Sequence, residues 1–132
     1  MFLRSFRFLL LLSTVFIAGC VWLSGNRVPI YNVVDAPLKH GDTLADVGED
    51  IRRAARMQSW EIEEVGPDVI YATKRRGQHV ATAAITYDAD SFSIQLRSSD
   101  YFKQTEDGRI HKLYNEWVRS LESTIRRELA GG

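Results

Sequence analysis

The residue whose chemistry stands out is Cys20, the only cysteine in the 132-residue chain. It follows directly after the small residues Ala18 and Gly19, which end an apolar run that begins at Phe8. Two arginines precede this run. A basic lead, an apolar stretch and small residues before a cut are the layout of a secretory signal peptide. Because a peptidase site needs small residues, this layout predicts a cut near Ala18 and Gly19, with the only thiol of the chain placed directly after it.

The stretch Ile17-Ala18-Gly19-Cys20 closely resembles the lipobox of bacterial lipoproteins. The resemblance implies a leader over residues 1–19 and two or three acyl chains on Cys20 that hold the chain in a lipid bilayer, since one chain alone anchors only marginally. Val21 in place of aspartate implies the outer membrane, facing the periplasm, in a Gram-negative cell. The apolar run is too short for a transmembrane helix, which needs about 20 residues. An ordinary cleaved signal peptide and an uncleaved signal anchor remain as alternatives.

The charge balance argues against a nucleic-acid partner. The chain has 17 basic and 17 acidic residues, and loss of the leader removes two arginines, which leaves 15 against 17 and a formal charge of −2. Nucleic-acid binding requires a concentrated basic face. With Cys20 acylated, no cysteine is left for a disulfide, so a hydrophobic core must stabilise the single domain that this length allows.

Hydrophobic periodicity predicts two helices and four strands after the leader. The predicted helices are residues 43–58 and 109–129, and the predicted strands are residues 60–65, 69–75, 79–87 and 91–97. Short turns between consecutive strands favour an antiparallel meander. The expected fold is α+β with two layers, in which an N-terminal and a C-terminal helix pack on one face of a four-stranded sheet. The division is a leader at 1–19, a lipidated cysteine and extended strap at 20–42, and one domain at 43–132.

Local signals add detail to this fold. Thr43 and Asp46 resemble a capping box at the start of the first helix. Residues 30–34 lie between prolines and are expected to form a strap over the domain or a short edge strand. In the polar loop 98–108, Tyr101 and Phe102 are expected to pin the loop to the core. The side chains expected on the apolar face of the third strand are Ala81, Ala83, Ile85 and Tyr87.

The residue types of known catalytic and metal sites occur without the spacing that those sites need. The three histidines, His40, His79 and His111, follow no metal-ligand spacing. The segment Ser98-Ser99-Asp100 lacks the glycines of a nucleophile elbow, and Asp88-Ala89-Asp90 lacks the glycine and terminal glutamate of a calcium loop. The sequence therefore predicts a turn at 88–90, no cofactor and no enzymatic activity.

The richest local cluster lies on the second helix. Tyr114 and Trp117 are three residues apart and share a helix face, with His111 and Asn115 nearby. Such a face binds a sugar or peptide in one interpretation. In the other, which the sequence favours, the two aromatic rings anchor the helix to the sheet and Asn115 satisfies a loop carbonyl.

A second resemblance covers most of the domain. Small bacterial envelope lipoproteins of unknown function combine a lipobox with a helix, a strand that begins with Trp, and a His before Ala-x-Ala-x-Ile-x-Tyr. A later helix in them carries Tyr-Asn-x-Trp-Val. The corresponding residues are Cys20, Trp60, His79 followed by residues 81–87, and residues 114–118. The resemblance implies localisation and fold, and it carries no activity.

Two hypotheses about function follow from these patterns. The favoured one is a non-enzymatic envelope lipoprotein that contacts an envelope protein or peptidoglycan through the open face of the sheet, marked by Gln95, or through loop 98–108. The rival is a small enzyme or ligand binder that acts on cell-wall or lipid material through His79 or His111, in a pocket beside Tyr114 or Asn115. The polar side chains expected on the open face are Thr82, Thr86, Ser93, Gln95 and Arg97.

Overall fold

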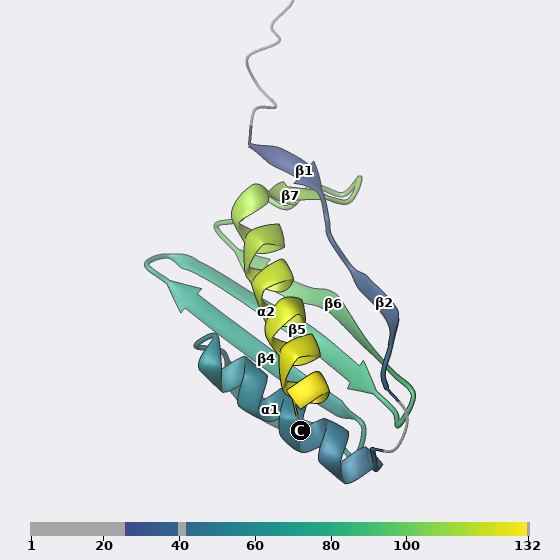
Figure 1. Cartoon of the computed structure of the whole chain (residues 1–132). Helices are drawn as coiled ribbons and strands as arrows, with labels where there is room; N and C mark the ends of the chain where they lie inside the picture. The colour runs from purple at the N-terminus through teal and green to yellow at the C-terminus, as the bar shows by residue number, and fades with distance from the viewer. Residues whose placement is uncertain (1–25, 40–41, 132) are drawn as a thin grey trace, which may run out of the picture.

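The structure, a computed structural model, describes residues 26–39 and 42–131. The expected leader at residues 1–19, Cys20 and His40 lie outside these ranges. The elements run in the order β1 (Arg27–Pro29), β2 (Val33–Pro37), α1 (Leu44–Met57), β3 (Glu61–Gly66), β4 (Val69–Arg76), β5 (His79–Tyr87), β6 (Ser91–Asp100), β7 (Arg109–His111) and α2 (Lys112–Gly131). The fold is α+β, with two helices and mainly antiparallel strands (Figure 1).

Helix α1 begins where the sequence predicts, because its cap is local. The Thr43 hydroxyl accepts a hydrogen bond from the Asp46 amide at 3.2 Å, and the Asp46 carboxylate accepts one from the Thr43 amide at 3.4 Å. This reciprocal pair satisfies two backbone donors that the first turn leaves free. The helix ends at Gln58, and its buried face consists of Val47, Gly48, Ile51, Ala54 and Ala55.

The main sheet has five strands in the order β2-β6-β5-β4-β3, so the predicted number of four was wrong. The predicted meander from β3 to β6 is confirmed. The additional strand, β2, pairs antiparallel with β6 through Val33 opposite Ile94 and Ala36 opposite Phe92. An edge strand was one of two expectations for residues 30–34, and the observed strand shares only residues 33 and 34 with that range. The turn between β5 and β6 is also confirmed, since the Asp88 carboxylate accepts hydrogen bonds from the amides of residues 90 and 91.

A small ribbon corrects the predicted start of the second helix. β1 pairs antiparallel with β7, so residues 109–111 are extended and α2 begins at Lys112 rather than at 109. The imidazole Nδ1 of His111 accepts a hydrogen bond from the Leu113 amide at 3.2 Å, which satisfies one of the free donors of the first turn. β6 also continues to Asp100, three residues beyond its predicted end.

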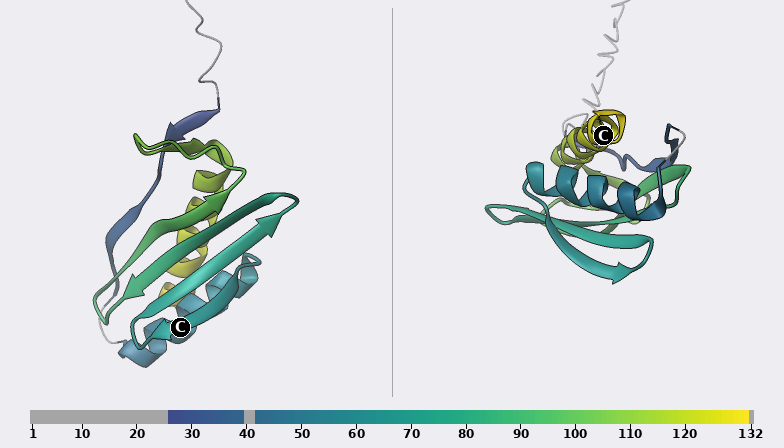
Figure 2. Two further views of the ribbon diagram at one scale, coloured as in Figure 1. Left: turned by 180° about the vertical axis from the view of Figure 1, so that it is seen from behind. Right: turned by 60° about the horizontal axis from the view of Figure 1, so that its bottom comes forward.

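Both helices lie on the same face of the sheet, as expected (Figure 2). Ala81, Ala83, Ile85 and Tyr87 all point into the core between the layers. The two alanines are fully buried, and their small side chains leave room for the helices above them. Phe102 is fully buried and packs edge-on against Trp117, with 5.1 Å between ring centroids. Its neighbour Tyr101 is 64% exposed, so the expectation that both rings would pin the loop was wrong for Tyr101.

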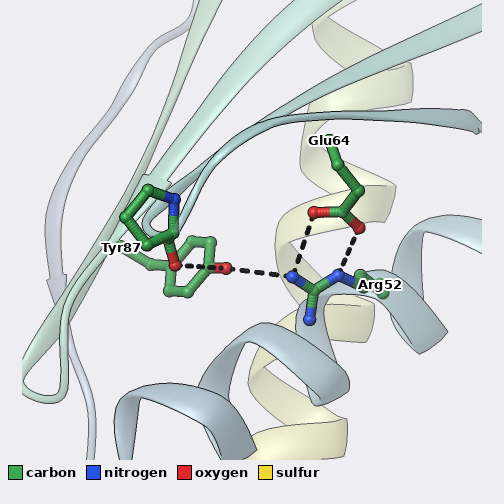
Figure 3. Close-up of polar contacts among 4 residues, drawn as sticks. Arg52, Glu64 and Tyr87 are labelled. Carbon is green, nitrogen blue, oxygen red and sulfur yellow. Dashed lines mark hydrogen bonds and ion pairs between the residues drawn. The ribbon is translucent and has the colours of Figure 1, made fainter.

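A polar contact group ties α1 to the sheet (Figure 3). The Arg52 guanidinium donates two hydrogen bonds to the Glu64 carboxylate, at 2.5 and 3.1 Å, and approaches the Tyr87 hydroxyl at 3.4 Å. That hydroxyl donates to the Pro67 carbonyl oxygen at 3.2 Å. Gly48 lies directly beneath it: a Cβ at this position would be 2.7 Å from the Tyr87 oxygen. Glycine therefore allows α1 to approach β5 closely at this point.

Candidate interaction surface

The face of the sheet opposite the helices carries no other described element (Figure 2, left). Its centre is formed by alternate residues of β4, β5 and β6, and we call this set the open face: Tyr71, Thr73, Thr82, Ala84, Gln95 and Arg97. Cross-strand register places Thr73 opposite Thr82, and Ala84 between Tyr71 and Gln95. The residues that the sequence predicts for a polar face therefore do share a face.

Side-chain contacts across the strands link several residues of the open face. The guanidinium of Arg97 lies 4.0 Å from the centroid of the Tyr71 ring and donates a hydrogen bond of 2.6 Å to its hydroxyl. The hydroxyls of Thr73 and Thr82 are 2.8 Å apart across the strands. Gln95 is exposed beside them. The open face thus presents an aromatic ring, a guanidinium, hydroxyls and an amide to solvent.

The cluster on α2 follows the structural interpretation. Tyr114 is fully buried and Trp117 is 6% exposed. Asn115 is buried and joins α2 to the end of β1 and the residues after it. Its Oδ1 accepts a hydrogen bond from the Tyr31 amide at 2.9 Å, and its Nδ2 donates one to the Pro29 carbonyl at 2.8 Å. Burial raises the pKa of the Tyr114 hydroxyl, which has no hydrogen-bond partner among the described residues. Tyr114 is therefore closed to a ligand, and both ends of the Asn115 amide are already hydrogen-bonded within the protein.

The structure brings His79 and His111 together, although 31 residues separate them in the chain. Their ring centroids are 6.1 Å apart, and His79 packs edge-on against Phe102 at 5.0 Å. No sequence pattern predicts this pairing, because it depends on the three-residue strand β7. The described residues contain no group of three or more His, Cys, Asp or Glu side chains able to hold a metal ion.

A hollow of about 390 Å³ lies beside Asn115, between residues 28–31 and α2. Neither histidine is among its lining residues, which are Val28, Pro29, Ile30, Tyr31, Lys112, Asn115, Glu116 and Arg119. The Tyr31 hydroxyl donates a hydrogen bond of 2.7 Å to Glu122, and this bond raises the tyrosine pKa. The Arg119 guanidinium lies over the same ring at 4.5 Å. The rival hypothesis needs a histidine in such a pocket, and this hollow does not supply one.

Comparison with known protein families, with curated proteins and with solved structures finds no match to this chain. In the part of the chain that the structure describes, neither helix is long and apolar enough to cross a membrane.

Proposed function

We propose that this protein is a non-catalytic lipoprotein of the bacterial cell envelope. It is anchored in the membrane by acylated Cys20, and it contacts another envelope component, a protein or peptidoglycan, through the open face. The anchoring rests on the stretch Ile17-Ala18-Gly19-Cys20 at the end of an apolar leader.

The observation that carries the contact is the ordered Tyr71–Arg97 pair at the centre of a sheet face that no described element covers. A solvated polar face is ordinary for an antiparallel sheet, so polarity alone supports little. Tyrosine and arginine, however, are the residue types that most often dominate binding interfaces. Here each holds the other in place, which lowers the side-chain entropy that a partner would otherwise have to remove.

Anchoring is tested by metabolic labelling with a palmitate analogue in the native host. The full-length chain should incorporate the label and the variant Cys20→Ser should not. Intact mass should show a mature chain that begins at residue 20 and carries acyl groups. Unlabelled wild-type protein of leader-containing mass would refute the anchoring.

The contact is tested by photo-crosslinking in cells, with the probe at Gln95. Matched probes at Arg53 and Ser123, both exposed on the helices, serve as controls. A discrete crosslinked product at Gln95 alone, lost in the variant Arg97→Ala, supports recognition through the open face. Equal background at all three positions refutes it and transfers the search to loop 98–108 and to the hollow beside Asn115.

A further inference from the structure

Basic side chains gather at one end of the domain and acidic side chains at the other. One end, which we call the basic end, is made by the β4–β5 hairpin, the β6–β7 loop and the β1–β7 ribbon (Figure 1). Its basic residues are Arg27, Arg75, Arg76, Lys103, Arg109 and Lys112. Four acidic residues accompany them: Asp100, Glu106, Asp107 and Glu116. The basic end therefore has a positive formal charge, although the mature chain as a whole is negative.

The opposite end, the acidic end, is made by the β3–β4 turn, the β5–β6 turn, the end of β2 and the start of α1. It carries six aspartates, Asp35, Asp42, Asp46, Asp68, Asp88 and Asp90. The basic residues near them are Lys39, Arg52 and Arg126, of which Arg52 pairs with Glu64 and Arg126 pairs with Glu122. Three of the aspartates line one hollow together, which shows how closely they gather. The domain is thus electrically polarised along the direction of its strands.

The side chains of the basic end are available to a partner. Arg75, Arg76, Lys103 and Lys112 are exposed, and none of them takes part in an ion pair within residues 26–39 and 42–131. Tyr101 stands among them, and it is the only aromatic residue of the described chain that is largely exposed. Tyrosine beside basic residues is the composition that favours the interface between lipid headgroups and acyl chains.

The segment that follows Cys20 joins the domain at the basic end. Asn26 is fixed there, since its carbonyl oxygen accepts a hydrogen bond of 2.9 Å from the Lys112 amide. Six peptide units separate Asn26 from Cys20. Even a fully extended chain of this length spans only about 20 Å. A bilayer that holds Cys20 is therefore within reach of the basic end, and the acidic end is the far one.

We propose that the basic end docks on the anionic phospholipid headgroups of the bilayer in which Cys20 is anchored, with the Tyr101 ring at the interface. This proposal rests on the acylation proposed above. An anionic surface attracts basic side chains within about a Debye length, roughly 8 to 10 Å under physiological conditions. It repels the aspartates of the acidic end, so attraction and repulsion both orient the strands along the membrane normal.

The test uses the mature acylated protein, purified from its host and reconstituted in vesicles. The thiol of Cys20 is consumed by acylation, so an introduced cysteine is the single site for a fluorescent probe. The matched positions are Gln78→Cys in the β4–β5 hairpin and Ala89→Cys in the β5–β6 turn, both exposed and uncharged in the native protein. Quenching by a spin label at the headgroup is compared between phosphatidylcholine vesicles and vesicles with about one third phosphatidylglycerol.

We expect anionic lipid to increase quenching at residue 78 at least twofold, and about 0.5 M salt to reverse the increase, because salt screens headgroup attraction. Quenching at residue 89 should stay low in both vesicles. The double variant Arg76→Gln/Lys103→Gln should lose most of the increase, whereas Arg56→Gln/Arg127→Gln, with the same change in net charge, should keep it. The variant Tyr101→Asn should reduce it while suiting the backbone, which has a φ of 62°.

Quenching at residue 78 that does not depend on anionic lipid overturns the proposal, and so does equal quenching at residues 78 and 89. Failure of acylation is distinguishable from failure of docking. A chain without acyl groups takes two probes instead of one, which intact mass shows before any quenching is measured.

Discussion

Gly48 offers the sharpest test of how α1 packs on the sheet. In an exposed helix, replacing glycine by alanine stabilises the fold by about 1 kcal/mol. Here the added Cβ would meet the Tyr87 hydroxyl at 2.7 Å, Arg52 Nη1 at 3.0 Å and the Tyr87 ring at 3.1 Å. We therefore expect Gly48→Ala to destabilise the protein, against the ordinary preference of a helix.

The size of the effect follows from three contributions. Overpacking a dense site costs about 1 to 3 kcal/mol. Displacing the Tyr87 hydroxyl from the Pro67 carbonyl costs about 1 kcal/mol more. The gain in helix propensity offsets about 1 kcal/mol of this. The expected net loss in the free energy of unfolding is about 1 to 3 kcal/mol.

Urea unfolding of the chain with Cys20→Ser, which removes the acylation site, measures this loss. A double-mutant cycle with Tyr87→Phe isolates the cause, because phenylalanine lacks the atom that the new Cβ meets first. Gly48→Ala should cost at least about 1 kcal/mol less in the Tyr87→Phe background than in the parent. A parent chain stabilised by Gly48→Ala, or an equal cost in both backgrounds, would show that the close approach to Tyr87 does not limit the packing of α1.

Three further predictions concern the strap, the β6–β7 loop and acid stability. Asn115→Ala should cost about 2 to 3 kcal/mol and speed hydrogen exchange at the Tyr31 amide, because two partly buried backbone groups lose their partner; unchanged exchange would contradict this. Phe102→Ala should cost about 3 to 5 kcal/mol in urea unfolding, whereas Tyr101→Ala should cost less than about 0.5 kcal/mol, and similar losses would refute the assignment of the two rings. The hydrogen bonds that Arg52 donates to Glu64 lower the pKa of the Glu64 carboxyl. The stability that this pair contributes is therefore present above about pH 4.5 and is lost as the pH falls through the lowered pKa. Wild type should thus lose slightly more stability than Glu64→Gln between about pH 5 and pH 3, by less than about 1 kcal/mol because the pair is half exposed, and parallel curves would contradict the reasoning.

The parts of the fold that could be predicted depend on signals that are close together in the chain. The capping box at Thr43 lies within four residues, and the meander follows from short turns between alternating strands. β2 was harder, because its partner β6 lies more than 50 residues away and a five-residue strand carries little periodicity. β1 and β7 have three residues each, too few for a hydrophobic periodicity of their own, so the sequence pattern includes residues 109–111 in the following helix.

In the candidate site, too, features with a local sequence signal could be predicted, and features that depend on distant pairings could not. Alternation along β5 and β6 was enough to place Thr82, Gln95 and Arg97 on one polar face. Loop 98–108 has no such period, and the sequence could not tell which of the neighbouring rings of Tyr101 and Phe102 enters the core. The pairing of Tyr71 with Arg97 requires the β4–β5–β6 register, which only the structure provides.

The two edges of the main sheet limit how other chains can join it. At one edge, β3 carries Glu61, Glu63 and Glu64, so like charges would meet if two copies were aligned. At the other edge, β2 shifts register against β6, has a φ of 46° at Asp35 and ends in Pro37, which offers no amide hydrogen. Such edges resist the addition of a further strand. Under the anchoring proposed above, copies would meet at high effective concentration in the membrane, and this resistance would keep them from polymerising into continuous sheets. For the partner proposed above, it favours recognition through side chains over the addition of a strand.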